Sequence, residues 1–351
     1  MKRIMLVVPS LKRGGAERIV SILSTHLAVD YDVTVVIYRD PIEYEYGGEL
    51  INLHSEVRKG FGKGLELLHK TWKLKKIIRQ VQPEVIVSFV GNLPVILTLA
   101  GVYPSIRNNP LMYPWIERLV VRVFYRLKNI RKVIAISEGV KGILVNNFKL
   151  KHVEMIYNPV DIQAIEQMMI EPVDHGKPYI IAVGRLHPQK GFDMLIDAYH
   201  RSGISDDYDL IILGEGAERE RLTEQIRSLH LENEIKLPGV VENPFKYMKN
   251  ARFFVLSSRY EGFGNVLVES LACGTTVVAF DCASGPSEII EHGSNGVLVP
   301  AGDVNALAGA LRTMADDAAL HDRLKGNARS SVLRFDVRNI IDRWVDRIFD
   351  E

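Results

Sequence analysis

Cysteine is scarce in this sequence: only Cys273 and Cys282 occur among its 351 residues. Two thiols are too few for a disulfide framework or a structural zinc site. The sequence also lacks a repeat with a period of about 20–50 residues, which excludes solenoids and propellers. Residues 1–10 show no charged region followed by a cleavage site. We therefore expect no secretory signal peptide and favour a reducing, cytoplasmic setting.

Long uncharged runs are also scarce, and the one of note covers residues 85–106. Its 22 residues could span a bilayer. The run is interrupted, however, by Gly91, Pro94 and Gly101. We therefore predict a buried strand at 85–90, a loop and a short apolar helix, with a transmembrane segment as the alternative.

Neither sign of charge dominates the whole chain, whose formal net charge is +1. The two halves differ, because residues 1–160 hold 24 Lys and Arg against 13 Asp and Glu, a net charge of +11. Residues 161–351 hold 20 against 30, a net charge of −10. Such opposite signs predict two domains with different partners.

Apolar runs alternate with amphipathic helices along both halves. Strands are predicted at 4–9, 33–38, 85–90, 132–136, 153–157, 179–183, 210–213, 235–237, 253–256 and 276–280. This alternation predicts the α/β class, with parallel sheets that are covered by helices on both faces. Prolines predict domains at 1–160 and 178–335, joined by a linker at 161–177. Because ligands bind beyond the carboxyl ends of parallel strands, we expect the active site in a central cleft between two facing Rossmann-like sheets.

Two basic residues, Arg185 and Lys190, lie in the segment GRLHPQKG that follows the predicted strand at 179–183. Arginine can donate paired hydrogen bonds to phosphate oxygens, and lysine adds a point charge. The alternative is a pair of solvated surface cations. The position of the segment after a buried strand favours an anion site.

Two glutamates, Glu261 and Glu269, stand on either side of a helix start that is predicted near Asn265. The glycines of EGFG let the backbone approach a ligand closely, and the helix N-terminus offers N–H groups to an anion. Side chains tilt toward the N-terminus of their helix, so Glu269 points back to that end. The pattern suits a molecule that joins a sugar, a diphosphate and a ribose; a capped surface helix is the alternative.

A third glycine turn, with Gly14 and Gly15, stands where the first predicted strand passes into a helix. It could present helix N–H groups to an anion, or it could be purely structural. It lacks the G-x-G-x-x-G spacing of dinucleotide-binding folds.

The spacing of Glu261 and Glu269 is the E-x7-E signature of retaining glycosyltransferases of family 4, which have the GT-B fold. The sequence resembles this family over most of its length, through VGRLHPQKGF, SSRYEGFGNVLVESLACG, GPSEII and GSNGVLVPAGD, and most strongly over 179–305. The segment GGAER also looks like members that build bacterial surface polysaccharides. The resemblance implies a hexosyltransferase that needs no metal or cofactor and that moves an N-acetylhexosamine or hexose from a UDP-sugar to a glycan or lipid-linked acceptor. It also implies a helix at 336–351 that returns to the N-terminal domain.

The resemblance further implies a role for each matching residue. Arg185, Lys190 and Glu261 would form the catalytic set, in which the two cations bind the donor diphosphate and the glutamate contacts the transferred sugar. Glu269 would hold the ribose hydroxyls. The other donor-binding positions would be Gly14, Gly15, Gly239, Val240, Val241, Phe263, Gly264, Asn265, Val266 and Leu267, with the base near 239–241.

The sequence departs from the family in one loop, because Phe89-Val90-Gly91-Asn92 has no histidine where many members carry one. A histidine-dependent role cannot be transferred to it. The segments at 30–32 and 207–209 match the metal motif D-x-D, but both stand at the amino end of a predicted strand, away from a ligand edge. We therefore expect no metal site, and cations can supply the charge stabilisation instead.

Basic residues gather in two stretches, 58–79 and 107–132, where aromatic and aliphatic residues stand between them. They are Arg58, Lys59, Lys63, Lys70, Lys73, Lys75, Lys76 and Arg79, and Arg107, Arg118, Arg122, Arg126, Lys128, Arg131 and Lys132. Such helices can lie on anionic lipid. Solvated helix faces are the alternative, and no motif supports a nucleic-acid groove. We expect a membrane or acceptor surface formed by Lys70, Lys73, Lys75, Lys76, Arg118, Arg122 and Arg126.

Two other functions are compatible with the same fold. A nucleotide-sugar epimerase is disfavoured by the E-x7-E pattern, and a non-catalytic membrane adaptor by the intact Arg185, Lys190, Glu261 and Glu269. We expect a nucleotide-sugar donor, no nucleic acid, and a peripheral place on the inner face of the cytoplasmic membrane.

Overall fold

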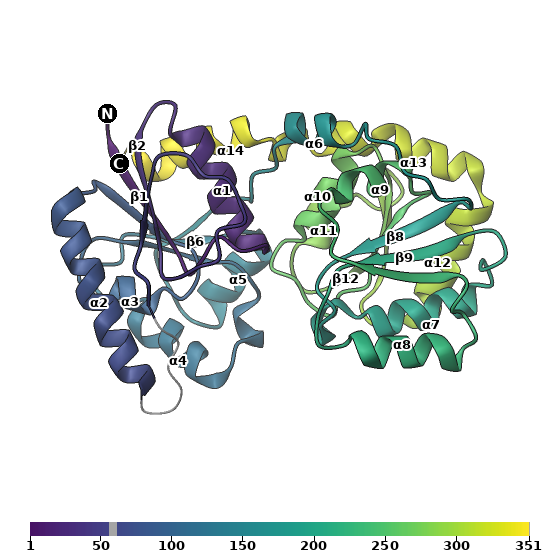
Figure 1. The fold of residues 1–351 in the computed structure, drawn as a ribbon, viewed down its shortest axis with the longest axis horizontal. Coiled ribbons are helices and arrows are strands. Elements are labelled where there is room, and N and C mark those ends of the chain that lie inside the picture. Colours follow the sequence, from purple (N-terminus) through teal and green to yellow (C-terminus); the bar gives the residue numbers. More distant parts are fainter. Residues whose placement is uncertain (56–61, 351) are drawn as a thin grey trace. The chain divides into compact units, whose positions relative to one another are not determined.

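The computed structural model describes residues 1–55 and 62–350. They form two compact units, one of Met1–Pro159 with Val337–Glu351 and one of Val160–Asp336. Each unit is built on its own parallel sheet, as the sequence predicts (Figure 1). Parallel strands need long crossovers, and helices fill them in both units.

The sheet of the first unit has seven strands in the order β3-β2-β1-β4-β5-β6-β7. Its strands are β1 Arg3–Val8, β2 Asp32–Ile37, β3 Glu49–Asn52, β4 Val85–Ser88, β5 Tyr103–Ile106, β6 Val133–Ala135 and β7 Val153–Met155. The central strands are almost wholly apolar and buried, as strands covered on both faces must be. The sequence analysis missed β3, a half-buried edge strand, and β5, which contains a proline.

The helices of the first unit are α1 Gly15–Leu27, α2 Gly62–Val81, α3 Leu93–Ile96, α4 Trp115–Phe124, α5 Glu138–Asn146 and α14 Val337–Trp344. Helix α1 begins at Gly15, within the glycine turn from which the sequence predicts a helix. Helix α4 begins only at Trp115. Pro114 precedes its first residue with extended backbone, and a separate 3₁₀ turn occupies Pro110–Met112, because proline is excluded from a helix interior.

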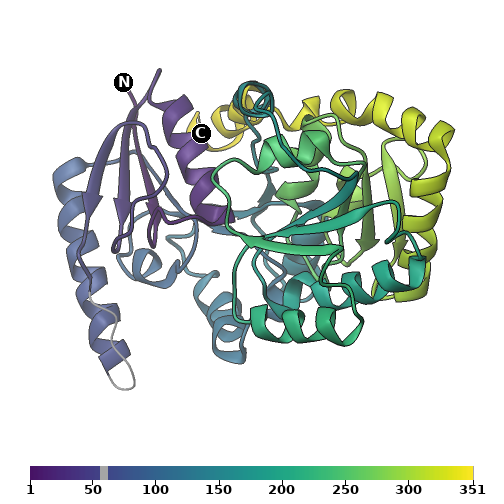
Figure 2. The same ribbon diagram turned by 45° about the vertical axis from the view of Figure 1, so that its right-hand side comes forward.

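The C-terminal helix α14 belongs to the first unit and lies beside α1 (Figure 2). Its side chains Ile340 and Trp344 are buried in the same core as Ile4 and Leu6 of β1. The Trp344 ring lies 6.2 Å from the ring of Phe89, measured between centroids. Burying a large aromatic side chain in this way stabilises the attachment of the C-terminal segment.

The segment at 85–106 is part of this core. It forms β4, the short helix α3 and β5, so the strand, loop and helix predicted there are confirmed and a second strand follows them. Within the described residues, no helix combines the length and the apolarity that crossing a membrane would require.

The sheet of the second unit has six strands in the order β10-β9-β8-β11-β12-β13. They are β8 Tyr179–Val183, β9 Asp209–Leu213, β10 Ile235–Gly239, β11 Phe254–Leu256, β12 Val277–Asp281 and β13 Gly296–Pro300. The helices are α6 Ile162–Met168, α7 Phe192–Ser202, α8 Arg219–Ser228, α9 Pro244–Asn250, α10 Asn265–Ala272, α11 Pro286–Ile289, α12 Val304–Asp316 and α13 Ala318–Ser331.

Helices cover both faces of this second sheet. One layer contains α7 with its neighbours α8 and α12, and the other contains α10 with α6, α9 and α13 (Figure 1). Helix α6 lies in the segment that we expected to be the linker, at 161–177, and it packs on α9 and α10 within the second unit.

Candidate active site

Three loops meet at the carboxyl ends of β8, β9 and β10. The N–H of Gly184 donates to the carbonyl of Leu213 at 2.9 Å, and the N–H of Gly214 donates to that of Gly239 at 2.8 Å. A Cβ at Gly214, where φ is +143°, would lie only 1.9 Å from the Gly184 carbonyl oxygen. Only glycine fits this approach, so the loops are fixed against one another at the edge where ligands of parallel sheets bind.

Arg185 projects from the loop after β8. The next residue, Leu186, is fully buried and exchanges backbone hydrogen bonds with Glu215 at 2.9 Å and Glu218 at 3.0 Å. These bonds to Leu186 fix the backbone of the adjacent Arg185, whose side chain is exposed. No described residue receives a hydrogen bond or ion pair from this guanidinium, which leaves a solvated cation on a rigid support.

Lys190 ends a 3₁₀ turn, Pro188–Lys190, in the same loop. The following Gly191 has φ of +62°, and a Cβ there would lie 2.1 Å from the carbonyl oxygen of Ser257. The Ser257 hydroxyl donates to the Lys190 carbonyl at 2.9 Å. The aliphatic part of the lysine crosses over Gly184, where a Cβ would come within 3.3 Å of its Cγ and Cε. Two loops therefore direct the ammonium group.

Glu261 receives that ammonium group. The residue is 6% exposed, and its Oε1 accepts from Lys190 Nζ at 2.6 Å and from the Ser258 hydroxyl at 2.7 Å. A buried carboxylate is stable only when it is paired in this way. No described residue donates to Oε2, so this second oxygen can accept a hydrogen bond from a ligand hydroxyl.

The loop after β12 holds the glycine-rich segment that follows Glu261. The Ser284 hydroxyl donates to the Glu261 carbonyl at 2.5 Å. Gly285, with φ of +98°, lies so close to the segment after Glu261 that a Cβ on Gly285 would be 2.0 Å from the Phe263 carbonyl oxygen. Burial, with a contribution from the charge of Glu261, raises the pKa of the nearby Cys282 thiol to about 12. The cysteine is therefore a neutral packing residue at this site.

Helix α10 begins at Asn265, as predicted. Gly264 precedes it with φ of +100° and has no side chain that could cap the first N–H groups. Glu269, in the second turn, is 6% exposed. It stands four residues, about one helical turn, after the start of the helix.

The segment 239–241 contains the end of β10. Gly239 is buried with φ of +91°, and Val240 is exposed. A cavity of about 390 Å³ begins at Val241 and continues along Asn243 to Lys246 and Tyr247. The expected position of the nucleotide base thus adjoins a cavity, which sequence reasoning did not identify.

In the first unit, Gly14 is the residue before α1, and its extended φ of −172° is open to any residue. A Cβ there would lie 2.4 Å from Oε2 of Glu17, the end of a flexible side chain. Gly15 is exposed at the first position of α1. Both glycines are therefore where the sequence predicts them, at the carboxyl end of the first sheet.

The loop that lacks the family's histidine is occupied by Asn92. Its Oδ1 accepts from the Ser88 hydroxyl at 2.7 Å, and its Nδ2 lies 2.7 Å from the hydroxyl of Tyr125 and 3.1 Å from the carbonyl of Ser105. All four residues are buried. Asn92 thus connects β4, β5 and the end of α4 inside the first unit.

Comparisons with known proteins show the family of the chain. A family model described as "Glycosyl transferases group 1" matches residues 164–331, and one described as "Glycosyltransferase Family 4" matches residues 13–164. The Campylobacter jejuni N-acetylgalactosamine-N,N'-diacetylbacillosaminyl-diphospho-undecaprenol 4-alpha-N-acetylgalactosaminyltransferase is 30% identical, and the match covers 96% of both chains. The chain belongs to the glycosyltransferases. A second C. jejuni relative, the GalNAc-alpha-(1->4)-GalNAc-alpha-(1->3)-diNAcBac-PP-undecaprenol alpha-1,4-N-acetyl-D-galactosaminyltransferase, is 24% identical over 99% of this chain and 98% of its own.

A solved structure shows the same fold. Anabaena HepE in complex with UDP-glucose superposes with a TM-score of 0.81, at 21% identity, and the match covers 99% of both chains. The transferase therefore has the GT-B fold, with two Rossmann-like parallel sheets.

The basic residues expected at a membrane or acceptor surface divide into two groups in the transferase. Lys70 forms an ion pair with Glu66 and lies 5.0 Å from the centroid of the Tyr38 ring, while Lys73 donates to the Leu53 carbonyl at 2.6 Å. Arg126 donates to the Phe148 carbonyl at 2.8 Å. Lys75 is half-buried, whereas Lys76, Arg118 and Arg122 are exposed; Arg58 and Lys59 lie outside the described residues.

The D-x-D segments stand at the amino ends of β2 and β9, as predicted. Asp209 is buried and is paired with His175 at 2.9 Å and Lys177 at 3.2 Å. Within residues 1–55 and 62–350, no group of three or more His, Cys, Asp or Glu is arranged to hold a metal ion.

Proposed function

We propose that the transferase moves an N-acetylhexosamine or hexose from a UDP-sugar to a glycan or lipid-linked acceptor in the synthesis of a bacterial surface polysaccharide or glycoconjugate. The names of the relatives support this proposal, because two C. jejuni relatives transfer N-acetylgalactosamine to diphospho-undecaprenol-linked acceptors. The reaction would proceed without a cofactor.

The observation that carries the proposal is the contact of Lys190 with Glu261, because the loop that provides Lys190 also carries the exposed Arg185. A sugar donor presents hydroxyls next to a diphosphate. Oε2 of Glu261 would accept from a sugar hydroxyl, while Lys190 and Arg185 would neutralise the phosphate charge. Fixed charges that face developing charge are the largest source of rate enhancement in many enzymes.

The proposed transfer retains the configuration at the anomeric carbon. The bond from that carbon to the donor phosphate breaks, and the acceptor oxygen forms the new bond on the same face. The departing phosphate takes the proton of the acceptor hydroxyl, so no protein base is required. Arg185 and Lys190 would stabilise the negative charge that this phosphate gains.

Glu269 would hold the ribose from within α10, and the N-terminal end of that helix would meet the distal phosphate. The base would lie at 239–241, against main chain. This division of the donor between separate residues allows each contact to be removed on its own.

We further propose that the transferase works at the inner face of the cytoplasmic membrane. The net charge of +11 in residues 1–160 favours an anionic surface, and exposed basic residues on α2 and α4 would contact it. The acceptor in such a place would be embedded through its lipid.

Incubation with a panel of UDP- and GDP-sugars tests the proposal directly. Transfer of labelled sugar from a UDP-sugar to a lipid-linked acceptor, with release of UDP, is the expected result. Conversion of the donor into its epimer without any acceptor would identify an epimerase instead. Vesicle binding without donor binding or transfer would identify an adaptor. Either result would overturn the proposed function.

A further inference from the structure

Helix α4 presents apolar side chains on two opposite sides. Val121 and Tyr125 are buried against the first unit. On the opposite side, Ile116 is 56% exposed, and Leu119 and Val123 are each 49% exposed. Helices on the surface of soluble proteins place polar residues on that outer side, so this one is built to contact a second apolar environment.

The outer apolar face extends beyond the helix at both ends. Met112, in the 3₁₀ turn before the helix, is 52% exposed, and Leu127, after the helix, is 36% exposed. Trp115, the first residue of the helix, is 71% exposed. Tryptophan has an apolar body with one polar N–H, a combination that suits the boundary between water and acyl chains.

A basic stripe runs along the side of this apolar face. Arg118 and Arg122 are spaced by four residues, so they lie in one row on the helix, and Arg126 follows in the turn after the helix ends at Phe124. The only acid in α4 is Glu117, in its first turn. An apolar face beside a row of arginines is the pattern of a helix that lies in the plane of an anionic membrane interface.

The basic row leads to a cavity of about 290 Å³ at the C-terminal end of α4. Basic side chains line it from two segments: Arg126 after the helix, and Lys149, Lys151 and His152 before β7. None of the described residues that line it is acidic. The cavity therefore suits an anion, and its size exceeds that of a single phosphate group.

The cavity and the apolar face share a residue. Leu127 lines the cavity and also ends the exposed apolar row. A lipid headgroup has the same arrangement, because its phosphate is joined to acyl chains. The continuity of the two surfaces favours a membrane lipid over a free phosphate ion or an acidic protein segment.

We propose that α4 lies in the interface of an anionic membrane, with its outer face among the acyl chains and a lipid phosphate held in the cavity lined by Arg126, Lys149, Lys151 and His152. This inference deepens the proposed membrane attachment and rests on it. It adds the insertion of the apolar face of α4 and one headgroup site to the exposed basic charge on α2 and α4 that the proposed function invokes.

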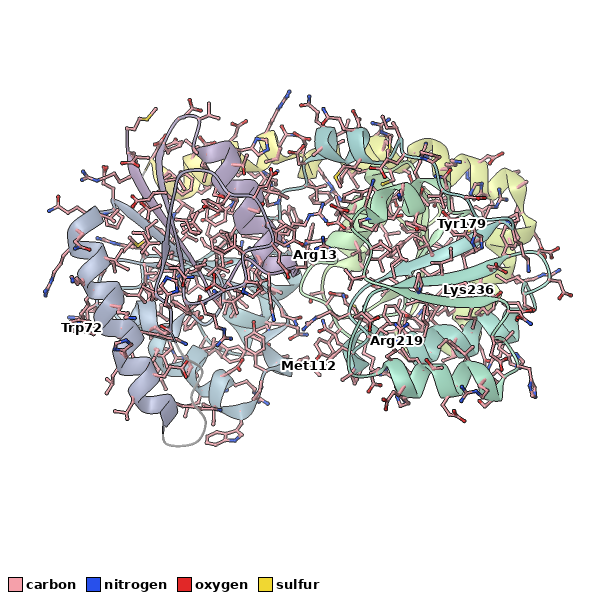
Figure 3. The ribbon with its side chains drawn as sticks, in the orientation of Figure 1. Arg13, Trp72, Met112, Tyr179, Arg219 and Lys236 are labelled. Atoms are coloured by element: carbon pink, nitrogen blue, oxygen red, sulfur yellow. The ribbon has the colours of Figure 1, made fainter. Side chains whose placement is uncertain are left out.

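Tryptophan fluorescence can test the position of α4. Trp72 and Trp115 are exposed, and Figure 3 shows Trp72 projecting outward from α2, whereas Trp344 is buried. A Trp72→Phe variant leaves Trp115 as the exposed reporter. Vesicles of phosphatidylcholine and phosphatidylglycerol should shift its emission to shorter wavelength, and brominated acyl chains should quench it. Unchanged Trp115 emission in protein that sediments with the vesicles would overturn the assignment to α4.

The headgroup site is tested by Lys149→Asn with Lys151→Gln. Asparagine suits position 149, where φ is +54°. Each basic residue near an anionic membrane surface contributes ~1 kcal/mol to the free energy of binding. The double variant should therefore bind anionic vesicles roughly 30-fold more weakly. Lys249→Gln with Lys325→Gln, which removes two exposed charges from the second unit, is the matched control and should leave binding within about twofold.

The outcomes distinguish a lipid headgroup site from a free-phosphate site and from a solvated basic surface. Equal vesicle binding by the two double variants would overturn the headgroup site. A site for free phosphate would instead show inorganic phosphate competing with vesicles at constant ionic strength, which would also overturn the proposal. UDP binding and transfer to a water-soluble acceptor should be the same in both variants. If the wild-type protein lacks these activities, the proposed function is contradicted, regardless of the result of the vesicle-binding measurements.

Discussion

The Nζ of Lys190 lies 2.6 Å from Oε1 of Glu261, so the residues that we assign to the phosphate and to the sugar of the donor contact each other directly. The lysine holds the carboxylate with the help of Ser258. Groups that are positioned before the reaction need not reorganise during it. The pair therefore fixes the orientation of Glu261 as well as supplying positive charge.

This contact predicts different effects for the two cations. Arg185→Ala and Lys190→Ala should each lower the transfer rate ~10²–10³-fold, the usual cost of one preorganised charge contact. Lys190→Ala should also lower the free energy of unfolding by about 1–3 kcal/mol, because it leaves a buried carboxylate without its partner. Arg185→Ala should leave the free energy of unfolding unchanged, because Arg185 is exposed. Rate assays and denaturant titrations check both expectations, and wild-type rates in both variants would remove the assignment.

The two glutamates should separate donor binding from turnover. Glu269→Ala should weaken UDP binding, because its proposed partner is the ribose. Glu261→Gln should keep UDP affinity and lower the transfer rate, because its proposed partner is the reacting sugar. Titration calorimetry with UDP, beside rate assays, distinguishes the variants. An equal loss of UDP affinity in both would show that the roles are not divided in this way.

Gly285 should be needed for its close approach to Phe263. Gly285→Ala combines the strain of a left-handed residue, ~1–2 kcal/mol, with overpacking of ~1–3 kcal/mol. Gly293 is the matched control, because its φ of +78° is also left-handed but a Cβ there meets nothing within 4 Å. Gly293→Ala should therefore show only the strain. Thermal unfolding of both variants measures the difference, and similar losses would argue against a steric role for Gly285.

The stereochemistry and metal dependence of the reaction can be measured together. The product should keep the α configuration of the donor, since the proposed attack is on the face that the phosphate leaves. EDTA should not abolish activity, because Arg185 and Lys190 would supply the positive charge. Proton NMR of the glycosidic product reports the configuration. A β-linked product would contradict the retaining mechanism, and inactivation by EDTA with rescue by a divalent ion would contradict metal independence.

The parts of the site that the sequence predicts are those that local chemistry determines. Glycines before Asn265 predict the start of α10, and the spacing places Glu269 one turn into it. The contact of Gly285 with Phe263 was missed, because it joins residues that are far apart in sequence and depends on the packing of two loops. The same holds for the hydrogen bond from Ser284 to Glu261.

In the fold, too, the sequence predicts the features that local residues determine and misses those that depend on distant contacts. Apolar runs such as β1 and β8 are recognisable because both faces of each strand are buried. Strand β5 has the sequence YPSI, whose proline and serine give no strand signal, and it is defined by pairing with β4 and β6. The exposure of Lys76 beside the engaged Lys70 could not be predicted, since it depends on how α2 rests on the sheet.

This difference among the lysines of α2 gives the last prediction. Replacing Lys70, Lys73, Lys75 and Lys76 with Gln should weaken binding to anionic vesicles and leave UDP binding unchanged, because the proposed donor contacts are mainly in the second unit. High salt should release the wild-type protein without detergent, since exposed charges are screened beyond ~8–10 Å at physiological ionic strength.

Two double variants separate the contribution of these lysines to vesicle binding from their contribution to thermal stability. Lys75→Gln with Lys76→Gln should account for the loss of vesicle binding at unchanged thermal stability, because Lys76 is exposed and Lys75 makes no ion pair with a described residue. Lys70→Gln with Lys73→Gln should lower thermal stability, because it removes the ion pair to Glu66 and the hydrogen bond to Leu53. Sedimentation with vesicles and thermal denaturation measure the two effects. If the quadruple variant binds vesicles like the wild type, the basic side of α2 is a solvated face, and the attachment must reside elsewhere in the first unit.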